Sequence, residues 1–454
     1  MIGVTLAEIA AILGASSQGF DADAMVTGVR IDSRQVQPGD LFIAIKGERS
    51  DGARFVDAAL EAGAVAAVTT DEGPNRITVS EPENVLWAIA GDQRVRTSAT
   101  VIAITGSAGK TLTKDLLAAA LATQCLVKAT RANMNNEFGV PLTICSVEED
   151  TDALVVEVGA RGVGHIEQLM PLVRPDVSVV LNVGSAHVGE FGGLERTALA
   201  KSELVRGLGP DGVAVLNLDD PRTSAMRELA QRVITFGEHP DAQVRMTGVR
   251  IDESGRAELS VLIEGTGFDA RLPLPGAHLA SNALAALAVV WELGLDVQQA
   301  ADALATATTT SGRMQIYEVG GRSILDDSYN ASPESMAAGL KTLATFNGRR
   351  PTWAVLGAML ELGDRSLEEH DRIGRLATRL GISRLIVVGD AAAPILHAAR
   401  HEGMSPEDAT GAADIDDALG QLQQMPDGAV ILVKASRSVG LDRIVTAITR
   451  GDQA

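Results

Sequence analysis

The fold of the chain is decided by one stretch, Ala103-Ile104-Thr105-Gly106-Ser107-Ala108-Gly109-Lys110-Thr111-Leu112-Thr113-Lys114. Residues 100–104 are apolar and mostly β-branched, which predicts a buried parallel strand. Residues 114–121 are good helix formers without a breaker. A strand, a glycine-containing loop and a helix that begins at Gly-Lys-Thr are typical of a phosphate-binding loop.

Glycines in such a loop let backbone N–H groups approach phosphate oxygens, and the helix N-terminus adds partial positive charge. Lys110 would reach the β- and γ-phosphates, and the Thr111 hydroxyl would bind Mg²⁺. The loop departs from the general motif, because Ile104 stands where a glycine is usual. We predict phosphate binding at Gly106, Ser107, Ala108, Gly109, Lys110 and Thr111.

Composition excludes several classes of protein. The net charge of −20 opposes general binding to nucleic acid or to an anionic membrane. The chain has no uncharged apolar run of about 18 residues and no basic segment at its start, so we expect no membrane insertion and no secretory signal. Cys125 and Cys145 lie in apolar contexts and are expected to be buried thiols, which favours a cytoplasmic protein.

The length of 454 residues predicts about three domains, and the pattern of apolar runs predicts an α/β fold. Residues 1–97 read as a small N-terminal α/β domain. Residues 98–311 alternate apolar strands with helices, which predicts a central domain with a mostly parallel sheet. A run of small residues at 306–312 precedes a third unit, residues 312–454, which reads as a second doubly wound, Rossmann-like domain.

Polar side chains follow two strands of the predicted central sheet, at the edge where such sheets bind ligands. Glu157 ends an apolar strand, and a buried carboxylate needs a cation partner. That partner is either Mg²⁺, which prefers oxygen ligands, or a structural arginine. His187 follows the strand at 177–183, and a loop histidine there is either part of the phosphate site or without a special role.

Other candidates allow two interpretations each. Asn133, Asn135 and Asn136 form either a polar ligand surface or a capped turn before a helix. Ser33 and Arg34 are an anion site or a solvated surface pair.

The basic loop with Lys434 and Arg437 suits a carboxylate or phosphate, or is simply solvated. Lys201, taken alone, is expected to be a solvated helix lysine. His278 and Asn282 can share a helix face, either as ligands or as a polar helix entry.

Taken in order, these motifs resemble the Mur ligases of peptidoglycan synthesis. The matching segments span essentially the whole chain: 32–34 with 38–40, 106–114, 133–141, 157–161, 182–187, 200–203, 326–330, 356–363 and 433–438. Asp-Asp-Ser-Tyr-Asn at 326–330 and Glu-Leu-Gly at 361–363 point to the branch that adds D-alanyl-D-alanine.

The resemblance implies a three-domain enzyme with a UDP-substrate domain, a central ATPase domain and a C-terminal Rossmann-like ligase domain. ATP would phosphorylate the free carboxylate of UDP-N-acetylmuramoyl-tripeptide, and D-alanyl-D-alanine would attack the acyl phosphate. The expected enzyme is a cytoplasmic monomer. Two alternatives stay open: a sister ligase that adds a single amino acid, and a non-catalytic nucleotide-binding protein.

The resemblance also implies residue roles. Lys110, Lys201 and His187 would be catalytic, with Lys201 at the position that is carbamylated in the family. Thr111 and Glu157 would ligate one Mg²⁺, His187 would help hold a second, and the Lys201 carbamate would support Mg²⁺. The remaining roles are ATP binding by Asn282, Arg313 and Asp327, and substrate binding by Ser33, Arg34, Asn133, Asn135, Asn136, Arg161, Lys434 and Arg437.

Two positions depart from the family pattern. Ala108 stands where the family loop often has asparagine, which removes a side-chain contact and leaves the backbone cradle. Ala53 stands where the first domain often has histidine, so nucleotide contacts there are less specified.

Overall fold

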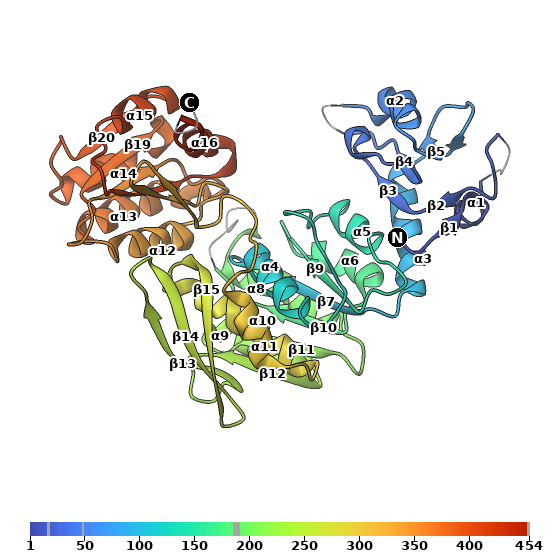
Figure 1. Cartoon of the computed structure of the whole chain (residues 1–454), viewed down its shortest axis with the longest axis horizontal. Helices are drawn as coiled ribbons and strands as arrows, with labels where there is room; N and C mark the ends of the chain where they lie inside the picture. The colour runs from blue at the N-terminus through green and yellow to red at the C-terminus, as the bar shows by residue number, and fades with distance from the viewer. Residues whose placement is uncertain (16–18, 48–49, 185–190, 452–454) are drawn as a thin grey trace.

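The computed structural model describes residues 1–15, 19–47, 50–184 and 191–451. Figure 1 shows three groups of elements along the chain: a first unit, a central unit and a third unit on the opposite side of the central one. The predicted α/β fold with mostly parallel sheets is confirmed. In the described part of the chain, no helix is both long enough and apolar enough to cross a membrane.

The first unit is built on a four-stranded parallel sheet in the order β3-β4-β5-β6. Its strands are β3 (Gly28–Arg30), β4 (Asp40–Ile43), β5 (Ala66–Thr69) and β6 (Arg76–Thr78). A small antiparallel pair and three helices complete it: β1 (Val4–Thr5), β2 (Met25–Val26), α1 (Leu6–Leu13), α2 (Val56–Glu61) and α3 (Pro82–Arg96).

The central unit carries a nine-stranded sheet in the order β15-β14-β13-β12-β11-β10-β7-β9-β8. The strands from β8 to β13 pair in parallel and are β7 (Thr100–Thr105), β8 (Val127–Ala129), β9 (Ala153–Glu157), β10 (Val177–Val180), β11 (Val213–Asn217), β12 (Arg232–Gly237) and β13 (Val244–Ile251). Two antiparallel strands extend it, β14 (Arg256–Ile263) and β15 (Thr266–Pro275).

We did not predict this antiparallel extension. Its signal is present in the sequence, because buried and more exposed side chains alternate along β14, as expected for a sheet with one solvated face.

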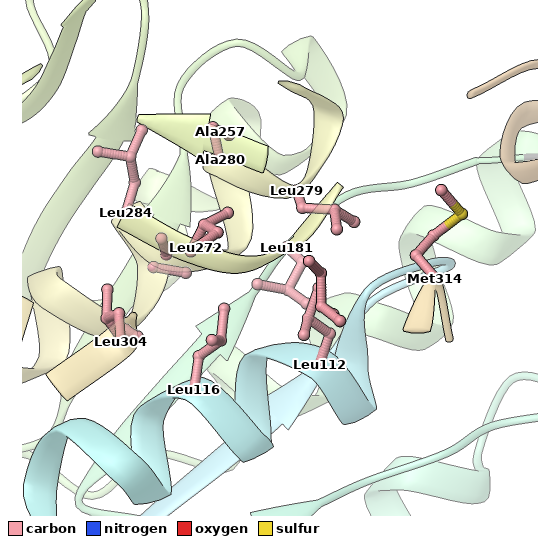
Figure 2. Packing of buried hydrophobic residues seen from close by; sticks show 14 of the residues in the cluster. Leu112, Leu116, Leu181, Ala257, Leu272, Leu279, Ala280, Leu284, Leu304 and Met314 are labelled. Carbon is pink, nitrogen blue, oxygen red and sulfur yellow. The ribbon is translucent and has the colours of Figure 1, made fainter. Parts of the chain in front are cut away.

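Alternate side chains of β7 enter two different cores. Ile102 and Ile104 pack with α4 (Lys110–Leu121), α10 (Ala280–Glu292) and α11 (Val297–Leu304), whereas Val101 and Ala103 face α3, α5 (Gly139–Ile144), α6 (His165–Val173) and α8 (Leu194–Arg206). Figure 2 shows the first of these cores, where Leu112 and Leu116 on α4 lie beside Leu181 and Leu272. Strand β7 is therefore covered on both faces, which fixes the loop that follows it.

The third unit is a six-stranded sheet in the order β16-β17-β21-β18-β19-β20, and all its pairs are parallel except β16 with β17. Its strands are β16 (Gln315–Val319), β17 (Arg322–Asp326), β18 (Thr352–Leu356), β19 (Arg384–Val388), β20 (Ala409–Ala412) and β21 (Val430–Lys434). Its helices are α12 (Pro333–Ala344), α13 (Ser366–Arg379), α14 (Ala393–His401), α15 (Ile415–Leu422) and α16 (Asp442–Gly451).

Candidate functional site

A cleft of about 800 Å³ opens at the carboxyl ends of β7, β9 and β10. Its floor is the predicted phosphate-binding loop with Glu157 and Lys201, and Asp327 and Lys434 of the third unit form part of one wall. Trp87 of the first unit also lines it. Parallel strands end at one edge of a sheet, which explains why residues distant in the sequence meet here.

The loop between β7 and α4 has the backbone of a phosphate cradle. Helix α4 begins at Lys110, directly after Gly109, whose φ of 82° is in the left-handed region that favours glycine. The Lys110 ammonium donates to the Gly106 carbonyl at 2.7 Å and so folds back over the loop. The N-terminus of α4 therefore faces the cleft with partial positive charge.

Two asparagines from other elements hold this loop. Asn182, just beyond β10, hydrogen-bonds both backbone groups of Ala108. Its Oδ1 accepts from the Ala108 N–H at 2.9 Å, and its Nδ2 donates to the Ala108 carbonyl at 3.2 Å. Asn282 on α10 donates to the Gly109 carbonyl at 3.2 Å and to Thr113 Oγ1 at 2.9 Å. These hydrogen bonds fix the shape of the loop.

Glu157 is buried at the end of β9, at 1% exposure, and hydrogen bonds orient both of its oxygens. Thr111 Oγ1 donates to Oε2 at 2.8 Å, and Asn135 Nδ2 donates to Oε1 at 2.7 Å. Among the described residues, no lysine or arginine makes an ion pair with this carboxylate. The structural-arginine interpretation is therefore not supported there. Lys110 is close enough for its charge to interact with Glu157, but it makes no ion pair with the carboxylate, which can still accept a further cation.

The donor set fits Mg²⁺. A carboxylate and a hydroxyl are hard oxygen ligands, and Mg²⁺ in phosphate sites is commonly held by one or two carboxylates together with substrate phosphates. Within the described ranges, no group of three or more acidic, histidine or cysteine side chains forms a ready-made metal site. Nucleotide phosphates would have to complete the coordination.

Lys201 lies on α8 and is 3% exposed, so the expectation of a solvated helix lysine is wrong. Its ammonium is 6.0 Å from the centre of the Phe191 ring. In the described part of the chain, its Nζ has no carboxylate within ion-pair distance. Burial, with a contribution from Lys110, lowers the pKa of Lys201 well below its usual value, which favours a neutral amine.

The third unit contributes a stacked group of side chains to the cleft. The Arg313 guanidinium lies 4.3 Å from the centre of the Tyr329 ring, and its buried Nε has no hydrogen-bond partner among the described residues. Lys434 Nζ, at 2% side-chain exposure, pairs with Asp327 Oδ2 at 2.5 Å and donates to the Asn330 carbonyl at 2.8 Å. The Lys434 ammonium is therefore already paired with groups of the protein itself.

The structure brings together most of the predicted site residues. The predicted residues that line the cleft are those of the phosphate loop together with Glu157, Lys201, Asn133, Asn135, Asn136, Arg161, Asn282, Arg313, Asp327 and Lys434. Asn136 also caps α5, because its Oδ1 accepts from the Gly139 N–H at 2.9 Å. His187 lies outside the described residues.

Three predicted residues do not line the cleft: Ser33, Arg34 and Arg437. Arg34 is exposed and makes two hydrogen bonds to Asp32, at 2.9 and 2.8 Å, which lower the pKa of Asp32 to about 2. Arg437 donates to Asp442 at 3.3 Å and lies 5.6 Å from the centre of the Tyr329 ring. Their substrate-binding roles stay predictions.

Several residues that line the cleft had no assigned role from sequence, among them Asn182, Tyr329 and Trp87. Asn182 and Tyr329 were visible as members of quoted motifs, since each follows a strand. Trp87 had no signal other than its rarity, as one of only three tryptophans.

Family models cover most of the chain. Residues 25–110 match the "Mur ligase family, catalytic domain", residues 104–290 the "Mur ligase middle domain", and residues 312–437 the "Mur ligase, glutamate ligase domain". This chain is a member of the Mur ligase family.

Relatives support this over the full length of this Mur ligase. A UDP-N-acetylmuramoyl-tripeptide–D-alanyl-D-alanine ligase of Mycobacterium bovis is 39% identical and is covered to 99%, with 100% of this chain aligned. The crystal structure of MurF from Acinetobacter baumannii has a TM-score of 0.87 at 29% identity, over 99% of both chains. MurF ligase from Thermotoga maritima, in complex with ADP, has a TM-score of 0.81 at 31% identity, over 94% of this chain and 98% of that one.

The positive φ of Gly109 makes Gly109→Ala a sharp test of the cradle. A Cβ there would lie 2.2 Å from Asn282 Nδ2, so Asn282 would have to move away from the loop. We expect the free energy of unfolding to fall by about 1–3 kcal/mol and nucleotide affinity to fall about tenfold or more. Calorimetric titration with nucleotide and chemical denaturation would measure both.

Gly91→Ala is the matched control, because Gly91 lies inside α3 and a Cβ there meets nothing within 4 Å. It should leave nucleotide affinity unchanged and stabilise the chain by about 0.5–1 kcal/mol. Unaltered nucleotide binding by Gly109→Ala would contradict the described loop geometry.

Proposed function

We infer that this chain is an ATP-dependent ligase that joins D-alanyl-D-alanine to UDP-N-acetylmuramoyl-tripeptide by an amide bond. The observation that carries this inference is full-length similarity to ligases of that name, combined with a braced phosphate loop in the same cleft as a buried carboxylate. The ADP complex of the Thermotoga maritima relative supports ATP as the phosphoryl donor.

The first step transfers the γ-phosphoryl group of ATP to the free carboxylate of the tripeptide, which breaks the bond to ADP and forms an acyl phosphate. Lys110 and the N–H groups at the start of α4 would stabilise the charge on the transferred group. Burial, with a smaller contribution from nearby Arg313, lowers the pKa of Lys110. Arg313 would contact phosphate, and Asn282 and Asp327 would contact the nucleotide. The concentration of cationic groups explains how an anionic ligand binds a chain of net charge −20.

In the second step, the D-alanyl-D-alanine amine attacks the activated carbonyl carbon, and inorganic phosphate leaves from the tetrahedral intermediate. We assign UDP contacts to Ser33 and Arg34, sugar contacts to Asn133, Asn135 and Asn136, and a peptide-carboxylate contact to Arg161. Lys434 and Arg437 are proposed to bind substrate. A cytoplasmic location is supported by the free thiols of Cys125 and Cys145.

Mg²⁺, held by Thr111 and Glu157, would supply neutralisation of phosphate charge. We propose that His187 would help hold a second Mg²⁺ and that Lys201, as a carbamate, would support Mg²⁺ binding. A neutral Lys201 amine can attack CO₂, lose one proton to solvent and become a carbamate. This converts a buried cation into an anion with oxygen ligands, and the depressed pKa of Lys201 favours the reaction.

The proposed function is tested by product identification. The purified chain would be given ATP, Mg²⁺, UDP-N-acetylmuramoyl-tripeptide and either D-alanyl-D-alanine or single amino acids. We expect mass spectrometry to detect a UDP-linked product extended by the dipeptide, formed together with phosphate. Extension only by a single amino acid would contradict the substrate assignment, and no phosphate release with any acceptor would favour a non-catalytic protein.

Lys201→Ala tests the carbamate. We expect turnover to fall about 100-fold or more, because an anion that supports the metal is lost, with partial rescue by acetate or propionate. Lys128→Ala is the matched control, since Lys128 forms a surface ion pair with Glu148. The control should keep full activity and ignore added acids. Full activity of Lys201→Ala would remove Lys201 from the mechanism.

A further inference from the structure

Trp87 connects helix α3 to the loop that carries the asparagines. Its indole Nε1 donates to the Glu137 carbonyl at 3.0 Å, and the half-buried ring lines the cleft. Other residues of the same helix, Val85, Leu86 and Ile89, are fully inside the core that joins the first unit to the central one. Figure 1 shows α3 running from the first unit to the side of α5 and α6.

The loop at 133–138 is held firmly to the end of β9. The Asn135 carbonyl accepts from the Gly159 N–H at 2.9 Å, while the Asn135 side chain donates to Glu157. The loop is also tightly folded, because a Cβ on Gly139 would lie 2.2 Å from the Met134 carbonyl. Hydrogen bonds also brace the segment that holds Glu137: Asn136 Oδ1 accepts from the Gly139 N–H at 2.9 Å, and the Asn136 carbonyl accepts from the Val140 N–H at 3.0 Å. A contact at Glu137 therefore acts on a braced segment that is continuous with Asn135.

Continuous contacts therefore lead from α3 to the phosphate loop. Trp87 fixes Glu137, and Asn135 in the same loop orients Glu157 Oε1. Thr111 orients the other oxygen, Oε2. The carboxylate is thus aimed from two sides, and one of those sides depends on a residue of the first unit.

We propose that Trp87 is a positioning residue for Glu157: its indole N–H holds the asparagine loop so that the carboxylate is oriented to receive a divalent cation with the nucleotide. The proposal rests on the proposed function only in taking Thr111 and Glu157 as metal ligands. It assigns to the first unit, beyond substrate binding, a contribution to the phosphoryl-transfer site.

A purely structural role for Trp87 makes a different prediction, because α3 has a second anchor. Arg94 donates from Nε to the Val173 carbonyl at 2.9 Å and from Nη2 to the Arg174 carbonyl at 2.7 Å. This anchor fastens the same helix to the central unit without touching the asparagine loop. Arg94→Gln is therefore the matched control for a loosened helix.

The test measures binding of a non-hydrolysable ATP analogue, with and without Mg²⁺, by calorimetry on the full chain. Trp87→Phe keeps an aromatic ring and removes the N–H donor. We expect its Kd with Mg²⁺ to rise about three- to tenfold, the equivalent of one lost hydrogen bond, and its Kd without Mg²⁺ to stay unchanged. Arg94→Gln should lower the melting temperature and leave both Kd values unchanged.

A double-mutant cycle with Asn135→Ala completes the test. If Trp87 acts through Asn135, the double variant should bind the Mg²⁺ complex no more weakly than Asn135→Ala alone. Additive effects, or an equal loss with and without Mg²⁺, would overturn the proposal. Trp87→Leu, which also lacks the donor, repeats the measurement if Trp87→Phe does not fold.

The ligase assay of the wild-type chain separates the two levels. If the wild type has no ligase activity but Trp87→Phe still weakens nucleotide binding only in the presence of Mg²⁺, the proposed function is rejected and the positioning role of Trp87 is retained. If the wild type is an active ligase but the effects of Trp87→Phe and Asn135→Ala on the Kd are additive, the proposed function is retained and the positioning role is rejected.

Discussion

The site depends on the hydrogen bond between the Thr111 hydroxyl and the buried Glu157 carboxylate, 2.8 Å apart. Strands β7 and β9 are neighbours, and their register places Ile104 opposite Glu157. The first turn of α4 therefore starts beside the end of β9. The hydrogen-bond donors to this carboxylate are neutral, and the charge of Lys110 acts on it without forming an ion pair, so a cation that binds Glu157 directly would stabilise it. The hydrogen bond from Thr111 thus ties the phosphate loop to Glu157, the carboxylate that we propose as a metal ligand.

The rest of the cleft is arranged around this pair. Asn182 and Asn282 fix the loop by hydrogen bonds, from the end of β10 and from α10, and so hold its N–H groups in a defined orientation. Such pre-organisation avoids reorganisation during phosphoryl transfer. Buried Lys201 approaches from α8, and Arg313 stacks on Tyr329 from the third unit. Each unit of the chain thereby contributes to one reaction centre, as a ligase with three substrates requires.

Local sequence predicted the parts of this site that depend on neighbours in the chain. The strand, the glycine loop and the helix at 100–121 were predicted because periodicity and glycine placement are local signals. Glu157 was found because a carboxylate at the end of an apolar strand is unusual. The burial of Lys201 could not be read from its helix, because it depends on packing against distant elements; only the family resemblance indicated a special role. Likewise, the hydrogen-bond partner of Trp87, the Glu137 carbonyl, lies 50 residues away in the sequence. The ion pair of Arg34 with Asp32 at the surface is not specified by the motif in which both residues stand.

The most direct test of a metal site at Thr111 and Glu157 is to measure Mn²⁺ binding by electron paramagnetic resonance. The measurement compares the wild type with Glu157→Gln in the presence of an ATP analogue. Mn²⁺ replaces Mg²⁺ in such oxygen sites. We expect the wild type to bind Mn²⁺ together with the nucleotide, and Glu157→Gln to bind the nucleotide but release most of the Mn²⁺. Equal Mn²⁺ affinity in both proteins would contradict the claim that the Thr111–Glu157 pair is the metal site.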